Sequence, residues 1–105
     1  MINVLILIVT LISFKSMADV GKVLFITKCT QCHNTDPSKT GAVGPDIADS
    51  SFELIKLKTQ QRKYPTGYRP KRKTLIMPVI KLTDAQIESI RAYIATFKKS
   101  NKEVK

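Results

Sequence analysis

The two cysteines of this 105-residue chain lie three residues apart, and its only histidine directly follows the second one. The motif Cys29-Thr30-Gln31-Cys32-His33 has the C-x-x-C-H pattern of covalent haem attachment. Two thiols at this spacing can form thioethers to the two vinyl groups of one porphyrin, and the adjacent imidazole then lies under the iron as a ligand. The motif therefore predicts one haem c, bound through Cys29, Cys32 and His33.

Three other kinds of site share part of this motif. A structural zinc site needs about four ligands, whereas Cys29, Cys32 and His33 supply only three. A thioredoxin-like C-x-x-C motif needs a βαβ scaffold, and the sequence contains no strand pattern from which to build one. A simple disulfide would leave His33 without a role. Haem attachment accounts for all three residues.

The length allows one domain, and the first residues resemble an export signal. The segment 2–14 is nearly all apolar but shorter than the roughly 20 residues that a membrane span needs. Ser16 and Ala18 are small residues at the positions that a signal peptidase reads. We predict a signal peptide over 1–18 and a mature domain over 19–105 in the periplasm, with a frayed end over 98–105. Because the usual basic start is missing, a buried core helix and an uncleaved membrane tether remain alternatives.

The chain is strongly basic. It carries 18 Lys and Arg against 8 Asp and Glu, a net charge of +10, and removal of residues 1–18 takes away only Lys15. Such a charge predicts an anionic partner. Export argues against nucleic acid, and cleavage argues against stable membrane insertion. We expect a monomer that meets redox partner proteins through their acidic faces.

The mature chain reads as an all-α domain, because no useful stretch alternates with the period of a strand. One helix is predicted from Asp19 to about Thr30, followed by a loop over 34–46 that is rich in turn-forming residues. A short helix is predicted to begin near Ser50, with Glu53 as its capping-box partner. The segment 64–70, which contains two prolines and a glycine, ends helical structure.

The last predicted helix has the clearest signals. Thr83 and Gln86 have capping-box spacing, and Leu82 and Ile87 have the spacing of a hydrophobic staple. One apolar stripe follows along this helix, formed by Ile87, Ile90, Ile94 and Phe97.

The second axial ligand of the iron can be found by counting. His33 is the only histidine, so a second histidine ligand from the same chain is excluded. Met1 and Met17 lie in the predicted signal peptide, which leaves Met77, followed by Pro78, as the only thioether. A buried methionine by itself is as often core filler. Next to the haem motif, Met77 is predicted to ligate the iron, which raises the reduction potential and leaves no open position.

With these residues in view, the chain resembles the class I cytochromes c of the small bacterial monohaem type, over nearly all of its mature length. Gly21, Phe25 and Cys29 have the family spacing G-x-x-x-F-x-x-x-C, and Tyr93 resembles the aromatic residue of the last helix. The resemblance implies a cytochrome c-like fold of three to four helices wrapped around the haem. In that fold the N-terminal and C-terminal helices cross closely at the glycine and the aromatics.

The resemblance also implies a role for Gly44-Pro45, which is similar to the Gly-Pro that follows the haem motif in the family. The Pro45 carbonyl would accept a hydrogen bond from the imidazole of His33 and raise its basicity; the alternative is an ordinary turn. Tyr64, Tyr68 and Arg69 could donate hydrogen bonds to the haem propionates, or they could be solvated loop residues.

Six basic residues precede Met77 within a segment of twelve: Arg62, Lys63, Arg69, Lys71, Arg72 and Lys73. We expect a positive ring around the exposed haem edge that steers acidic partners; the alternative is a solvated loop.

The predicted function is a soluble electron carrier, since the sequence offers no catalytic acid, base or nucleophile. Two alternatives are a haem-bearing subunit of a larger oxidoreductase and a haem sensor from which Met77 dissociates.

Overall fold

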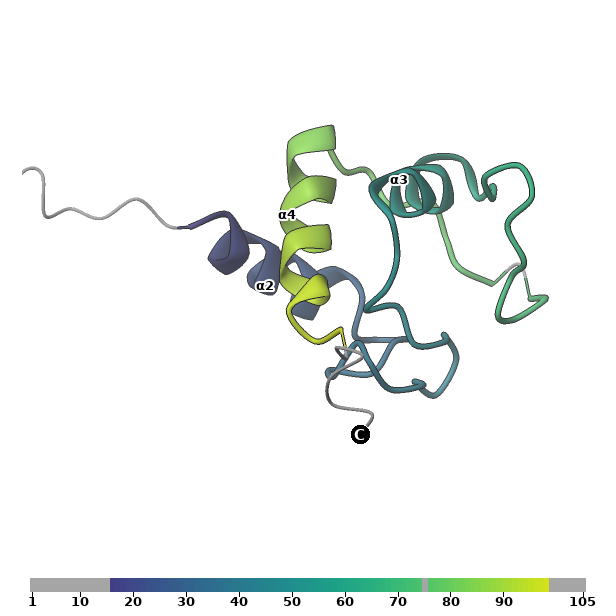
Figure 1. Ribbon diagram of the computed structural model, residues 1–105, viewed down its shortest axis with the longest axis horizontal. Helices are drawn as coiled ribbons and strands as arrows, with labels where there is room; N and C mark the ends of the chain where they lie inside the picture. Colours follow the sequence, from purple (N-terminus) through teal and green to yellow (C-terminus); the bar gives the residue numbers. More distant parts are fainter. Residues whose placement is uncertain (1–15, 75, 99–105) are drawn as a thin grey trace, which may run out of the picture.

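The computed structural model describes residues 16–74 and 76–98, and this part of the chain is helical, without strands. The helices are α2 (Met17–Lys28), α3 (Phe52–Gln61) and α4 (Asp84–Ala95). Figure 1 shows α2 and α4 crossing each other, with α3 set apart from them and long loops between. The all-α prediction is confirmed. The predicted signal peptide and frayed end lie almost entirely outside the described residues.

The core lies where α2 and α4 cross. Its buried apolar side chains are Phe25, Leu82, Ile87, Ile90 and Ile94. Phe25 is fully buried, and its ring centroid lies 5.7 Å from that of Tyr93. A Cβ atom added to Gly21 would lie 1.9 Å from the carbonyl oxygen of Ser89. The absence of a side chain at Gly21 is therefore what lets the two helices approach so closely, as the family resemblance implied.

We expect Gly21→Ala to destabilise the protein, because the new methyl group meets the backbone of α4, which cannot rotate away. Overpacking of this kind costs about 1–3 kcal/mol of unfolding free energy, or roughly 4–8 °C in melting temperature per kcal/mol for a domain of this size. Lys22→Ala, at the exposed neighbouring position of the same helix, is the matched control and should melt as the wild type does. Equal melting temperatures for the two variants would contradict the close crossing.

The caps locate the helix ends within two residues of the predicted positions, with one correction. The side chain of Ser51, not Ser50, caps α3 by accepting a hydrogen bond from Leu54 N, so Glu53 is not a capping-box partner. Either serine has a side chain that can cap a helix. Ser50 belongs to the preceding turn, where its N–H donates to the Ile47 carbonyl. The first helix ends at Lys28 rather than at Thr30.

The last helix follows the sequence pattern closely. Thr83 and Gln86 form both hydrogen bonds of the predicted capping box. Ile87, Ile90 and Ile94 are buried on one stripe, whereas Phe97 lies beyond the end of the helix, in a turn.

The helix α3 contacts the rest of the protein through both apolar and polar side chains. Phe52 and Ile55 pack against the core cluster. Lys56 forms an ion pair with Asp84 at 3.1 Å, and Gln60 donates to the Leu82 carbonyl at 3.2 Å. The Thr59 carbonyl accepts from Ile80 N at 2.8 Å. None of the helices described is long and apolar enough to cross a membrane.

Candidate functional site

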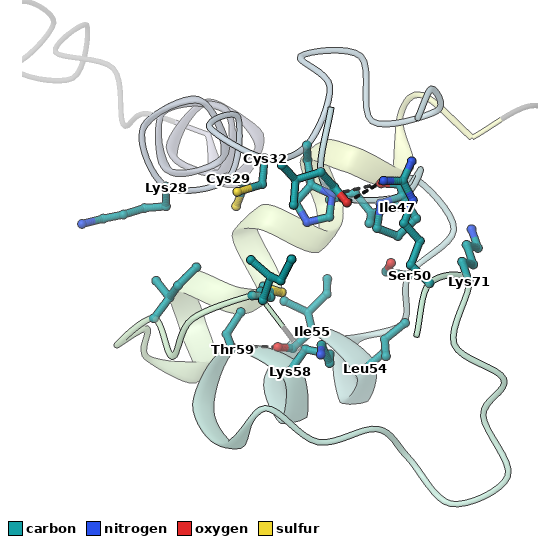
Figure 2. Close-up of a pocket in the computed structure, with 18 of the residues that line it drawn as sticks. Lys28, Cys29, Cys32, Ile47, Ser50, Leu54, Ile55, Lys58, Thr59 and Lys71 are labelled. Atoms are coloured by element: carbon teal, nitrogen blue, oxygen red, sulfur yellow. Dashed lines mark hydrogen bonds between the residues drawn. The ribbon is translucent and has the colours of Figure 1, made fainter. Parts of the chain in front are cut away.

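A pocket opens between the C-terminal end of α2, the helix α3 and the segment that follows residue 70. Figure 2 shows Cys29 and Cys32 on one side of it and Leu54, Ile55 and Lys58 of α3 on the opposite side. His33 and Met77 also belong to the lining. The structure therefore brings all four predicted haem-binding residues to one cavity.

His33 is held by one well-defined hydrogen bond. Its Nδ1 lies 2.9 Å from the Pro45 carbonyl oxygen. A carbonyl can only accept, so Nδ1 carries the proton and the neutral imidazole has its free electron pair on Nε2. Nε2 is thus the atom available to a metal, and the bond to Pro45 raises its basicity.

The loop that carries Pro45 packs directly against the histidine ring. A Cβ atom added to Gly44 would lie 2.4 Å from Cε1 of His33, and one added to Gly41 would lie 2.5 Å from the Cys32 carbonyl. Gly44 N also donates to the Cys32 carbonyl at 2.8 Å. Gly41 and Gly44 therefore lack side chains because the C-x-x-C-H segment leaves no room for them. An ordinary turn would not impose this close contact.

The two cysteines are unpaired thiols in the structure. Burial raises the pKa of the Cys29 thiol to about 11. The surroundings of Cys29 therefore favour the neutral thiol over the thiolate as long as nothing is bound to its sulfur. Among residues 16–74 and 76–98, no group of three or more His, Cys, Asp or Glu side chains is arranged to hold a metal ion.

Met77 is half-buried in the pocket lining, to which its neighbours Ile76 and Pro78 also belong. Ile76 and Val79 are nevertheless 63% and 52% exposed. The segment around Met77 therefore forms part of the cavity wall and also presents apolar surface to solvent.

The residues predicted to meet haem propionates separate into two groups. Tyr64 and Tyr68 line the pocket, with their rings stacked at 5.5 Å, and burial raises the pKa of Tyr68. The Tyr64 hydroxyl donates to the Arg72 carbonyl at 3.5 Å. Arg69 is exposed and lies outside the lining.

Sequence reasoning missed Lys58, which is only 9% exposed and lines the pocket. Its Nζ lies 4.3 Å from the centroid of the Tyr64 ring. A buried ammonium group needs an anion or a π face to offset its lost hydration. Lys58 follows Leu54, which also lines the pocket, by four residues, or about one helical turn. This spacing could have indicated from the sequence that Lys58 lies on the same face of α3.

Two members of the basic segment make contacts inside the protein. Lys71 forms ion pairs of 2.9 Å with both Asp46 and Asp49. The hydrogen bond from Lys71 lowers the pKa of Asp46. Burial alone would lower the pKa of Lys71, but its bonds to the two carboxylates raise it. Arg72 donates to the carbonyls of Val43 and Gly41.

A comparison with protein families gives one match: the cytochrome c family model covers residues 18–98. The chain belongs to the cytochrome c family. No curated protein and no solved structure gives a significant match. Members of the family carry covalently bound c-type haem and transfer electrons.

The pocket of this cytochrome c fits that haem. The two thiols lie on one side, as thioether bonds require, and the lining supplies an imidazole with a free Nε2 and a thioether. The remaining wall is largely apolar, with Ile47, Leu54, Ile55, Ile80, Leu82, Ile90 and Ile94 in it. The buried Lys58 and the hydroxyl groups of Tyr64 and Tyr68 suit the two carboxylates of the porphyrin.

Proposed function

We propose that this cytochrome c is a monomeric electron carrier with one haem, ligated by His33 and Met77 and attached through Cys29 and Cys32. The observation that carries the proposal is the convergence of these four residues on one cavity, with His33 Nδ1 committed to Pro45 and Nε2 left free. Haem bound there supplies a one-electron Fe(II)/Fe(III) couple. The chain's own residues hold the ligands in place and exclude water from them.

The experiment is to produce the protein with a haem-maturation system and extract it with acidified acetone. We expect the haem to stay with the polypeptide, and the protein to exchange one electron reversibly. The Cys29→Ser/Cys32→Ser double variant is the control, which should release any haem that it binds. Haem lost from the wild type would refute covalent attachment.

The carboxylates of the haem are assigned to the region of Lys58, Tyr64 and Tyr68. Lys58 is the buried cation of the lining, and the two tyrosines present hydroxyl groups beside it. Arg69, as an exposed residue, would have to move in order to reach them. We expect the reduction potential to depend more strongly on pH in Lys58→Met than in Arg69→Met, because a carboxylate without its cation titrates nearer neutral pH.

For the partner, we propose acidic redox proteins that dock where Ile76 and Val79 are exposed beside the basic segment. Lys63, Arg69 and Lys73 of that segment are exposed, whereas Lys71 and Arg72 are engaged with the loop 41–49. The electron-transfer rate is expected to fall as ionic strength rises, because salt screens the attraction.

Matched charge variants test this docking face. Lys73→Gln should weaken the salt dependence, and Lys22→Gln on α2 should leave it as in the wild type. A rate that stays flat or rises with salt would contradict the docking proposal.

The proposed location is the periplasm, after cleavage of residues 1–18. Mass spectrometry of the exported protein should find Asp19 at its N-terminus. A retained segment 1–18 would instead indicate a tethered protein.

A subunit of a larger oxidoreductase is the second candidate. Val20, Val23 and Ile26 favour it, since they form an exposed apolar stripe on α2. Sedimentation of the native protein in its host extract distinguishes the two: a free carrier sediments as a monomer, and a subunit with a large partner.

A further inference from the structure

Two neighbouring cations, Lys71 and Arg72, reach from the segment before Met77 to the loop 41–49. Lys71 Nζ lies 3.1 Å from the Asp46 carbonyl oxygen and 2.9 Å from carboxylate oxygens of Asp46 and Asp49. Arg72 donates to the Val43 carbonyl at 2.6 Å and to the Gly41 carbonyl at 3.5 Å. We call this pair and its contacts the clasp.

The contacts of the clasp lie on both sides of Pro45 in the chain, and Pro45 is the residue that orients His33. Arg72 holds carbonyls that precede Pro45 in the chain, and Lys71 holds the carbonyl of the residue directly after it. Because each peptide unit is planar, contacts to the Val43 and Asp46 carbonyls restrict the backbone rotations between these residues, and with them the direction of the Pro45 carbonyl. That carbonyl accepts the 2.9 Å hydrogen bond from His33 Nδ1.

Backbone hydrogen bonds hold the same loop from two other segments, the haem motif and the turn at Pro37, and Gly41 N donates to the Gly44 carbonyl directly before Pro45 at 2.9 Å. Gly44 N and Val43 N donate to the Cys32 carbonyl at 2.8 and 3.2 Å, which ties the start of the loop to the haem motif. After Pro45, the contacts that run to another segment are those of Asp46 and Asp49 with Lys71, and of Ile47 N and Ala48 N with the Pro37 carbonyl. Lys71 and Arg72 add side-chain contacts from a further segment, and those of Lys71 with the two carboxylates are charge-assisted.

We propose that Lys71 and Arg72 are positioning residues, which keep the Pro45 carbonyl aligned with His33 Nδ1 and so set the electron donation from His33 to the iron. The clasp also joins the segment that leads to Met77 to the loop that orients His33, so the two sides of the haem site move together. The proposal rests on the ligation proposed above. It assigns these two cations an internal role in place of the docking role that the sequence indicated.

The sign of the change in reduction potential separates this role from simple electrostatics. Removing a positive charge near the haem favours Fe(III) and lowers the potential. A weaker Nδ1–H bond makes His33 a poorer donor, which disfavours Fe(III) and raises the potential. The two explanations therefore predict opposite shifts for the same substitution.

The experiment compares two double variants of the holoprotein. Lys71→Met/Arg72→Met removes the clasp, and Lys63→Met/Lys73→Met removes the same charge from exposed positions of the same segment. Reduction potentials are measured by voltammetry, and exchange of the His33 Nδ1 proton with solvent is followed by NMR of the reduced protein. Lys71→Arg keeps a cation that can reach both carboxylates and serves as the conservative variant.

We expect the clasp variant to have a higher potential than the control variant and an Nδ1 proton that exchanges about fivefold faster or more, the factor for one hydrogen bond of ordinary net strength. Lys71→Arg should restore the wild-type values. If the double variant takes up no haem, the single variants Lys71→Met and Arg72→Met are expected to shift the potential in the same direction by smaller amounts.

Equal potentials in the two double variants, with unchanged exchange, would overturn the clasp. So would a new pH dependence of the potential with unchanged exchange, since that would place Lys71 and Arg72 on the haem carboxylates. Failure of the proposed ligation is seen separately, as a wild-type spectrum without the iron–sulfur charge-transfer band.

Discussion

The Met77→Ala variant is expected to lose the iron–sulfur charge-transfer band that the oxidised wild type should display. Met77 is the only methionine beyond residue 17, and it lines the same cavity as His33. No other thioether can replace it. The reduction potential should fall by a few tenths of a volt, within the about 0.8 V that axial-ligand identity spans. Optical spectra and voltammetry of the purified holoprotein measure both changes.

A nearby exposed position gives the matched control for this variant. Val79 is 52% exposed and lies outside the lining of the pocket, so Val79→Ala should keep the band and a potential close to that of the wild type. Carbon monoxide should bind to reduced Met77→Ala and not to Val79→Ala at neutral pH. Carbon monoxide binding to the wild type would instead favour the sensor function, and a band that survives in Met77→Ala would rule out Met77 as the ligand.

The second large effect is expected for Gly44→Ala. Its methyl group would lie 2.4 Å from Cε1 and 2.5 Å from Nδ1 of His33, far inside van der Waals contact. Either the ring or the loop must move, and either movement breaks the hydrogen bond to Pro45. We expect a loss of about 1–3 kcal/mol in unfolding free energy, together with a raised potential. Thermal melting and voltammetry are the measurements.

Ala42→Ser is the control for Gly44→Ala, because Ala42 is an exposed residue of the same loop. It should melt within about 0.5 kcal/mol of the wild type and keep the wild-type potential. A Gly44→Ala protein with wild-type stability and potential would mean that the loop does not press on His33.

The features that could be predicted from the sequence are those that follow local rules. Thr83 and Gln86 form their capping box because a side chain three residues away reaches the backbone whatever the rest of the fold does. The stripe of Ile87, Ile90 and Ile94 follows from helical geometry alone. The haem motif is equally local, since its chemistry depends on five consecutive residues.

The features that could not be predicted depend on contacts between distant segments. Lys71 meets Asp46 and Asp49 across 25 and 22 residues of chain. Charged loop residues have no periodicity, so their partners leave no pattern in the sequence. The helix α3 ends at Gln61 and is capped by Arg62 in the left-handed region, with φ of 58°, where a glycine would have been the usual signal.

Lys58 lies between these two cases. Helical spacing from Leu54 predicts which face of α3 carries Lys58. That this lysine is buried beside a cavity can be known only from the structure. Arg69, which the sequence left open as either a carboxylate partner or a solvated residue, lies two residues from Lys71 and is exposed. A basic segment predicts the presence of cations near the site and leaves open which of them turn inward.

The core and the cavity wall share side chains. Leu82, Ile90 and Ile94 belong to both, and Ile55 and Ile80 line the cavity while they pack against the core. One side of this small core is therefore open to whatever occupies the cavity. Bound haem would complete the burial of these side chains, so loss of the haem should cost the protein stability as well as its redox couple.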